Sequence, residues 1–179
     1  METIRKTRLE AWAAIKIGVD EAGVTRGCLH QFQLAQLRET IRWAARQSPF
    51  YRKLLKNCAP EEPACLEDLV RFPFTTEDDL RQQGLQFLCV SQGEINRVVT
   101  LNSSGTTGPS KRLYFTAADQ ELTVDFFRYG MNSLTDSGDS VLILLPCERS
   151  GSVGDLLAKA LEKLQVIPVQ HGLIQSLSE

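Results

Sequence analysis

Residues 141–169 read VLILLPCERSGSVGDLLAKALEKLQVIPV, and this stretch decides the fold class of the chain. Its aliphatic run from Val141 to Leu145 has the length of a strand and is typical of a parallel strand that is covered on both faces. Ser152 and Asp155 then have the pattern of a capping pair that opens a helix. The apolar residues of that helix form one stripe: Leu156, Leu157, Ala160, Leu161 and Leu164. A short strand from Val166 to Val169 completes a βαβ unit, whose crossover is expected to be right-handed.

Two more strands and a second helix are predicted before this unit. Residues 97–101 (RVVTL) and residues 113–115 (LYF) have the composition of strands. Thr116 with Asp119 is a second capping pair, and it is expected to open a helix that runs to about Ser133. The pattern is therefore that of an α/β protein.

The earlier part of the chain is predicted to be mostly helical. Apolar residues recur at helical spacing over residues 31–47, and Ser48-Pro49 ends or restarts that helix. Thr76, followed three positions later by Asp79, has the pattern of another helix start. Residues 1–27 are ambiguous, because a helical apolar face is interrupted by glycines, the last of them Gly27.

The predicted organisation has two regions. Residues 1–90 form the mostly helical N-terminal region, and residues 91–179 form the α/β segment, which carries a loop of distinctive composition.

That loop lies between the two predicted strands, where residues 103–111 read SSGTTGPSK. Glycines let the backbone approach a ligand closely, and successive backbone N–H groups can form an anion-binding nest. Hydroxyl groups add donors or bind a phosphate-chelated magnesium, and a lysine supplies a positive point charge. Every charged residue between Glu94 and Asp119 is positive: Arg97, Lys111 and Arg112. A polyphosphate would therefore meet no carboxylate nearby in the sequence.

Two other interpretations of the loop compete with phosphate binding. Ser, Thr and Gly are ordinary residues of a connection between strands, so composition alone is equally typical of a hairpin loop. A nucleoside triphosphatase P-loop needs four residues between its glycines and a lysine directly after the second. Here two residues separate Gly105 from Gly108, and proline follows Gly108, so a P-loop of that class is excluded.

The loop strongly resembles the phosphate-loop signature of acyl- and aryl-CoA synthetases, [ST]-S-G-T-T-G-x-P-K. Residues 103–108 match it one by one, and Lys111 falls at its lysine position, while Ser110 stands where the signature has proline. Two further segments, residues 34–52 and residues 71–81 (RFPFTTEDDLR), resemble landmarks of the phenylacetate–CoA ligases. The resemblance, to the N-terminal portion of that family only, runs from about residue 31 to 170.

The resemblance implies a helical N-terminal region followed by part of the parallel or mixed sheet of the adenylate-forming large domain. It implies an ATP-dependent ligase reaction in which a carboxylate attacks the α-phosphate of Mg–ATP, and coenzyme A then displaces AMP. The implied cofactors are ATP, Mg²⁺ and coenzyme A, and the implied partner is a small-molecule carboxylic acid. The residues implied to hold the β- and γ-phosphates are Ser103, Ser104, Gly105, Thr106, Thr107, Gly108 and Lys111. No catalytic residue and no metal ligand is implied within these 179 residues.

The family's chains are more than twice as long, and the adenine segment, the ribose-contacting acid and a mobile C-terminal domain have no counterpart here. The first hypothesis is therefore an N-terminal piece of a ligase that is not competent alone. The alternative is a truncated, non-catalytic relative that acts as a binding or regulatory module or as half of a split enzyme. Its exposed apolar surface would then be covered by a partner or by a second copy. A third hypothesis, a relative in fold only, binds no nucleotide.

Composition excludes several other classes. Hydrophobic residues make up 42% and charged residues 23%, which is typical of a packed globular protein. A net charge of −2 argues against nucleic-acid binding. No apolar run approaches the length of a membrane helix, and no signal peptide is recognised, so a cytoplasmic protein is expected. Five cysteines without a CxxC pair and two histidines predict neither a disulfide framework nor a zinc site.

Overall fold

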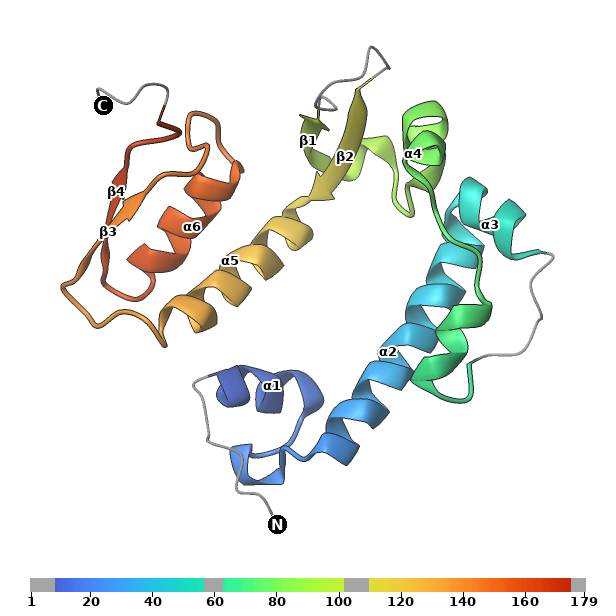
Figure 1. The fold of residues 1–179 in the computed structure, drawn as a ribbon, viewed down its shortest axis with the longest axis horizontal. Coiled ribbons are helices and arrows are strands. Elements are labelled where there is room, and N and C mark those ends of the chain that lie inside the picture. Colours follow the sequence, from blue (N-terminus) through green and yellow to red (C-terminus); the bar gives the residue numbers. More distant parts are fainter. Residues whose placement is uncertain (1–8, 57–62, 102–109, 175–179) are drawn as a thin grey trace. The chain divides into compact units, whose positions relative to one another are not determined.

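The computed structural model describes residues 9–56, 63–101 and 110–174 of the chain (Figure 1). The chain divides into two compact units, one formed by Thr25–Ala117 and the other by Met1–Val24 together with Ala118–Glu179. The predicted division near residue 90 follows the change from helical to strand composition, and as a division into domains it stays a prediction.

The unit Thr25–Ala117 begins with the long helix α2 (Arg26–Gln47). Thr25 caps this helix, because its hydroxyl accepts a hydrogen bond from the N–H of Cys28 at 3.2 Å. The predicted start at residue 31 and the predicted break at Gly27 are therefore wrong. A glycine in the first turn is tolerated where a side-chain cap satisfies the free N–H groups.

Ser48 connects α2 to the short helix α3 (Pro49–Leu55), and the predicted restart at Ser48-Pro49 is confirmed. The Ser48 hydroxyl accepts from the N–H of Tyr51 at 3.2 Å and donates to the carbonyl of Gln86 at 2.8 Å. Phe50, which is 7% exposed, stacks on Phe87 with ring centroids 3.9 Å apart. The helix junction is thus tied to the 3₁₀ turn η3 (Gly84–Phe87) by a buried polar contact and an aromatic pair.

The predicted helix start at Thr76 is confirmed by α4 (Glu77–Gln83). The Thr76 hydroxyl accepts from the N–H of Asp79 at 3.2 Å, and the Asp79 carboxylate accepts from the N–H of Thr76 at 2.9 Å. This reciprocal pair of bonds is a capping box. Two further 3₁₀ turns lie on either side of α4 and η3 in the sequence: η2 (Leu66–Arg71) and η4 (Gln92–Glu94).

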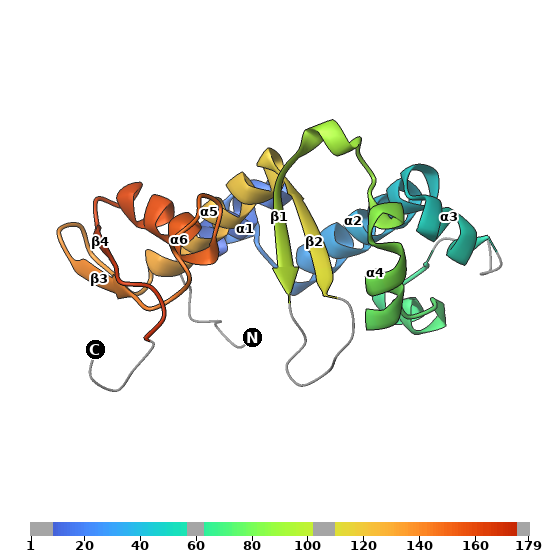
Figure 2. The same ribbon diagram turned by 90° about the horizontal axis from the view of Figure 1, so that it is seen from above.

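The predicted strands around the loop are confirmed as β1 (Ile95–Leu101) and β2 (Lys111–Thr116). They pair antiparallel, with Val98 opposite Tyr114 and Leu101 opposite Lys111. Figure 2 shows the two strands side by side, and Leu101 and Lys111 lie at the same end of the pair.

The second unit contains α1 (Leu9–Ile17), the 3₁₀ turn η1 (Glu21–Gly23), α5 (Ala117–Met131), β3 (Ser140–Ile143), α6 (Val153–Glu162) and β4 (Ile167–Gln170). Strands β3 and β4 pair parallel through the crossover helix α6, so the predicted βαβ unit is confirmed. The predicted strand end at Leu145 is wrong. Pairing stops at Ile143, whose carbonyl accepts from the N–H groups of His171 and Gly172 beyond β4.

The apolar stripe of α6 forms the core of this unit, as predicted. Leu161, which is fully buried, packs with Ile143, Ala158 and Val166. Leu156 and Ala160 form a second buried cluster with Val124 of α5. One face of the parallel pair is not covered by the described residues, because Leu142, Ile167 and Val169 are about half exposed. The expected cover on both faces is therefore wrong for this part of the chain.

The predicted start of α6 is confirmed, because Ser152 is its N-cap residue, but the Ser152 side chain makes no capping hydrogen bond among the described residues. The N–H of Ser152 donates to the carbonyl of Arg149 at 3.0 Å instead of to Asp155. The Asp155 carboxylate accepts from the N–H of Gly151 at 2.7 Å, where a φ of 75° turns the chain. The left-handed glycine thus moves the carboxylate's backbone partner one residue earlier.

Candidate functional site

The structure describes the residues on both sides of the predicted loop, at one end of the β1–β2 pair. Residues Ser103 to Gly108 themselves lie outside the described residues. Leu101 is the last residue of β1 and Lys111 the first of β2, and the two stand opposite each other in the register. The signature lysine therefore lies at the point where the chain leaves the loop and enters the sheet.

Lys111 forms an ion pair that sequence reasoning missed. Its Nζ donates to Oε1 of Glu77 at 2.8 Å, and its side chain is only 20% exposed. The expectation that no carboxylate lies near the loop is therefore wrong in space, although it holds along the sequence. Glu77 stands 34 residues earlier, in the segment 71–81 that the family resemblance had already singled out. The match of both segments to one family was the available signal that they share a site.

The ion pair belongs to a cluster of four charged residues. The second carboxylate oxygen of Glu77, Oε2, accepts from Nη2 of Arg81 at 2.9 Å, and Nη1 of Arg81 donates to Oδ1 of Asp78 at 2.9 Å. The hydrogen bond from Lys111, with the charges of Lys111 and Arg81, holds the pKa of the Glu77 carboxyl below its ordinary value. We call Lys111, Glu77, Arg81 and Asp78 the α4 charge cluster. Its two cations and two carboxylates balance.

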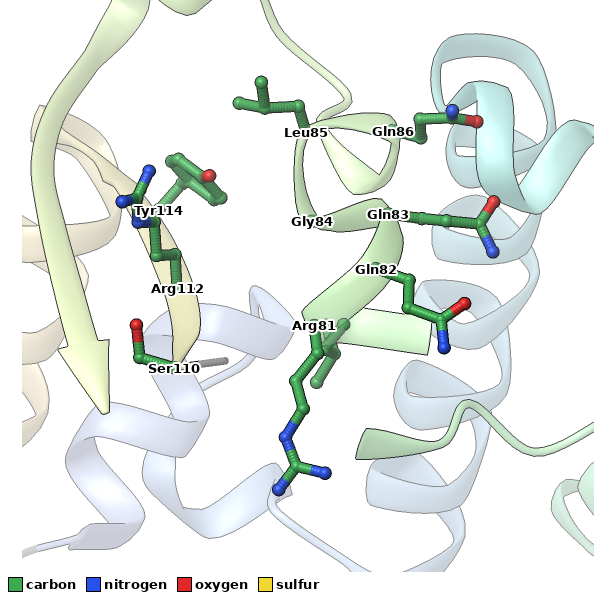
Figure 3. Close-up of a pocket in the computed structure, with 10 residues that line it drawn as sticks. Arg81, Gln82, Gln83, Gly84, Leu85, Gln86, Ser110, Arg112 and Tyr114 are labelled. Carbon is green, nitrogen blue, oxygen red and sulfur yellow. The ribbon is translucent and has the colours of Figure 1, made fainter. Parts of the chain in front are cut away.

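A cavity of about 490 Å³ lies beside this cluster, between β2 and the segment formed by α4 and η3 (Figure 3). Among the residues that the structure describes, the lining includes no carboxylate: Leu80, Arg81, Gln82, Gln83, Gly84, Leu85, Gln86, Ser110, Arg112 and Tyr114. Arg112 and Tyr114 are two residues apart on β2, so their side chains project from the same face of the strand.

The structure separates the three cations that the sequence placed around the loop. Arg97 stands opposite Phe115, and this places it on the face of the strand pair away from Arg112. Lys111 is held by Glu77. Arg112 is exposed and has no ion-pair or hydrogen-bond partner among the residues that the structure describes.

The described residues contain no group of three or more His, Cys, Asp or Glu side chains that could hold a metal ion. Within the same residues, no helix combines the length and the apolar character needed to cross a membrane. Four cysteines fall in the described part, and all four are free: Cys28, Cys65, Cys89 and Cys147.

Comparison with known proteins points to one group of enzymes. The chain is 38% identical over 94 residues to the phenylacetate-coenzyme A ligase of Pseudomonas putida, and 35% identical over 94 residues to those of Aromatoleum evansii and Thermus thermophilus. Each match covers 51% of this chain but only 21% of the relative. No protein-family model matches the chain.

The fold is that of a solved CoA ligase. Crystal structures of 2-hydroxyisobutyryl-CoA ligase superpose with TM-scores of 0.66 and 0.68 at 22% and 20% sequence identity. They cover 81% and 86% of this chain, and 32% and 37% of the ligase chain. Both of these structures contain 2-HIB-AMP and CoA. The chain is therefore related to the phenylacetate–CoA ligases and has the α/β fold of the adenylate-forming CoA ligases.

Proposed function

We propose that the chain is part of an ATP-dependent acyl- or aryl-CoA ligase and contributes its triphosphate-binding loop. The reaction of the whole enzyme joins a small carboxylic acid to coenzyme A, first by adenylation of the carboxylate and then by thioester formation. The observation that carries the proposal is the place of Lys111, at the start of β2 and directly after a stretch that matches the signature of these enzymes.

The role proposed for this chain is to hold the β- and γ-phosphates during adenylation. Backbone N–H groups and hydroxyls of residues 103–108 would surround the phosphate oxygens, and Lys111 would add a positive charge. The charge of the neighbouring cavity fits a polyphosphate, because the described part of its lining includes two arginines and no carboxylate. Mg²⁺ is proposed to arrive with the nucleotide phosphates, since the described residues offer no cluster of ligands for it.

The same proposal holds that these 179 residues do not form an adenylate by themselves. The matched segment is 21% of each relative's length, so most of a relative's chain has no counterpart in the match. Holding two phosphates orients the nucleotide but leaves the carboxylate unplaced, and both reactants must be positioned for an effective reaction.

The test is to titrate the purified chain with Mg–ATP and with pyrophosphate in a calorimeter, and then to assay pyrophosphate exchange with a panel of carboxylic acids. Binding without exchange is the expected result. Failure to bind either ligand at millimolar concentration would overturn the phosphate-binding proposal. Pyrophosphate exchange by the chain alone would refute the proposal that these residues do not form an adenylate by themselves.

Glu77→Gln is expected to strengthen pyrophosphate binding by about threefold, the scale of a partly exposed ion pair. In the structure the Lys111 ammonium is hydrogen-bonded to the Glu77 carboxylate, and a phosphate that binds Lys111 must compete with that carboxylate. Glutamine keeps the size of the side chain and removes its charge.

Asp78→Asn is the matched control for this change. It removes the same charge from the same helix turn, but Asp78 contacts Arg81 and not Lys111 among the described contacts. Equal gains in both variants would show a general effect of charge and would refute direct competition between Glu77 and phosphate for Lys111.

A further inference from the structure

The cations near the cavity differ in how much of their charge is available to a ligand. Arg81 donates to both Glu77 and Asp78, and Lys111 donates to Glu77, so the α4 charge cluster carries no net charge. Arg112 has no carboxylate partner among the described residues. The positive charge that remains at the cavity is therefore that of Arg112.

Arg81 also lines the cavity, but its two terminal nitrogens are bonded to the carboxylates of Glu77 and Asp78. The Nε of Arg81 is buried and has no hydrogen-bond partner among the described residues. A buried N–H without an acceptor is unfavourable, but this one has no exposed surface through which a ligand could reach it. A guanidinium group presents donors in a planar fork that matches the oxygens of a phosphate. Of the two arginines that line this cavity, Arg112 is therefore the one whose exposed guanidinium can donate to an oxyanion.

The size and the lining of the cavity indicate a ligand larger than a free phosphate ion. Its volume of about 490 Å³ falls in the range of pockets that bind small organic molecules. Tyr114 projects beside Arg112 in Figure 3 and packs along the backbone of Gly84, where an added Cβ would lie 3.7 Å from the tyrosine ring. An aromatic ring next to a guanidinium suits a planar base that carries a phosphate.

We propose that the cavity between β2 and α4–η3 binds a phosphate group of an adenine nucleotide through Arg112, as a subsite distinct from Lys111. The adenine nucleotide rests on the proposed function, and two sources share this chemistry there. One is the polyphosphate of ATP, and the other is the phosphorylated nucleotide of coenzyme A. The matched signature ends at Lys111 and assigns no role to Arg112.

The test measures binding of four ligands by calorimetry: pyrophosphate, ATP, coenzyme A and dephospho-coenzyme A, which lacks the 3′-phosphate. The proteins are the unaltered chain, Arg112→Gln, Lys111→Gln and the control Arg26→Gln. Arg26 is exposed in the first turn of α2, so its variant makes the same charge change away from the cavity. Circular dichroism verifies that each variant is folded, which is expected because Arg112 is exposed.

Arg112→Gln is expected to weaken the binding of at least one of the four ligands by about tenfold or more, because a charge-assisted contact is lost. Weaker binding of both ATP and pyrophosphate identifies the ATP polyphosphate as the source. Weaker binding of coenzyme A, with dephospho-coenzyme A unchanged, identifies the 3′-phosphate. The control Arg26→Gln is expected to stay within about twofold of the unaltered chain.

The outcomes separate this inference from the proposed function. Suppose that Lys111→Gln weakens ATP binding while Arg112→Gln binds all four ligands as the control Arg26→Gln does. The proposed role of the loop is then supported and the Arg112 subsite is refuted. If Arg112→Gln alone loses binding, the subsite stands and the role of Lys111 fails. If the unaltered chain binds none of the four ligands, both are refuted.

Discussion

Lys111→Gln is expected to weaken binding of Mg–ATP and of pyrophosphate by about tenfold or more, the scale of one contact between an ammonium and a phosphate. Glutamine preserves most of the length of the side chain but cannot attract an anion by charge. Isothermal titration calorimetry at one fixed salt concentration gives the two dissociation constants, because electrostatic contacts weaken as salt rises.

The ion pair between Lys111 and Glu77 contributes to the expected loss of binding in Lys111→Gln. The substitution removes the phosphate contact and frees the Glu77 carboxylate at the same time, so repulsion from Glu77 adds to the loss. The double variant Glu77→Gln with Lys111→Gln removes both. It is expected to bind pyrophosphate more tightly than Lys111→Gln alone, and the difference measures the contribution of Glu77.

Lys163→Gln is the control for Lys111→Gln. Lys163 also pairs with a glutamate, Glu121 at 3.3 Å, but in the other unit of the chain. It is expected to leave both dissociation constants unchanged. If Lys111→Gln also leaves them unchanged, Lys111 does not hold phosphate, and the match to the signature is structural only.

Leu161→Ala is expected to lower the free energy of unfolding by about 2–5 kcal/mol, the range for a leucine truncated in a packed core. Leu161 is 0% exposed and lies where α6 packs on β3 and β4, against Ile143 and Val166. Truncation leaves a cavity that the strands on one side and the helix on the other can only partly close.

Urea unfolding followed by tryptophan fluorescence measures this change in the relevant unit. The chain has two tryptophans, and Trp43 lies in the other unit and is 49% exposed, so Trp43→Phe leaves Trp12 as the reporter. Trp12 donates from Nε1 to Asp125 at 3.0 Å and stands edge-on to Phe126, contacts that unfolding removes.

Leu134→Ala, made in the same background, is the matched control. Leu134 is 76% exposed in the segment after α5, so the same truncation is expected to change the free energy of unfolding by less than about 0.5 kcal/mol. Equal losses at Leu161 and Leu134 would contradict the assignment of the α6 stripe as the core.

Local patterns in the sequence predicted those features that nearby residues decide. The Thr76–Asp79 capping box and the cap at Ser48 form between residues three positions apart, so their bonds depend on local backbone geometry alone. The βαβ unit could be predicted because a continuous aliphatic run and an amphipathic helix each have one stable way to bury their apolar atoms.

Predictions failed where a distant or an unexpected partner decided the outcome. The strand β3 ends at Ile143 instead of Leu145 because the residues after β4 take the last carbonyl. The predicted capping bond between Ser152 and Asp155 does not form, because the N–H of Ser152 donates to the carbonyl of Arg149. In the first case two N–H groups bind one carbonyl, and in the second case one N–H group has two possible acceptors. The composition of a segment does not reveal which partner lies nearest.

The sequence by itself determined the α/β class, the βαβ unit, the strands on either side of residues 103–111 and the relation to CoA ligases, because each depends on local spacing or on matched residues. Only the tertiary structure placed Glu77 against Lys111 and set Arg112 beside a cavity whose described lining has no carboxylate. The physical reason is range: a capping bond or an apolar stripe spans one helix turn or one strand, whereas an ion pair between residues 34 positions apart exists only once the helix and the strand have packed.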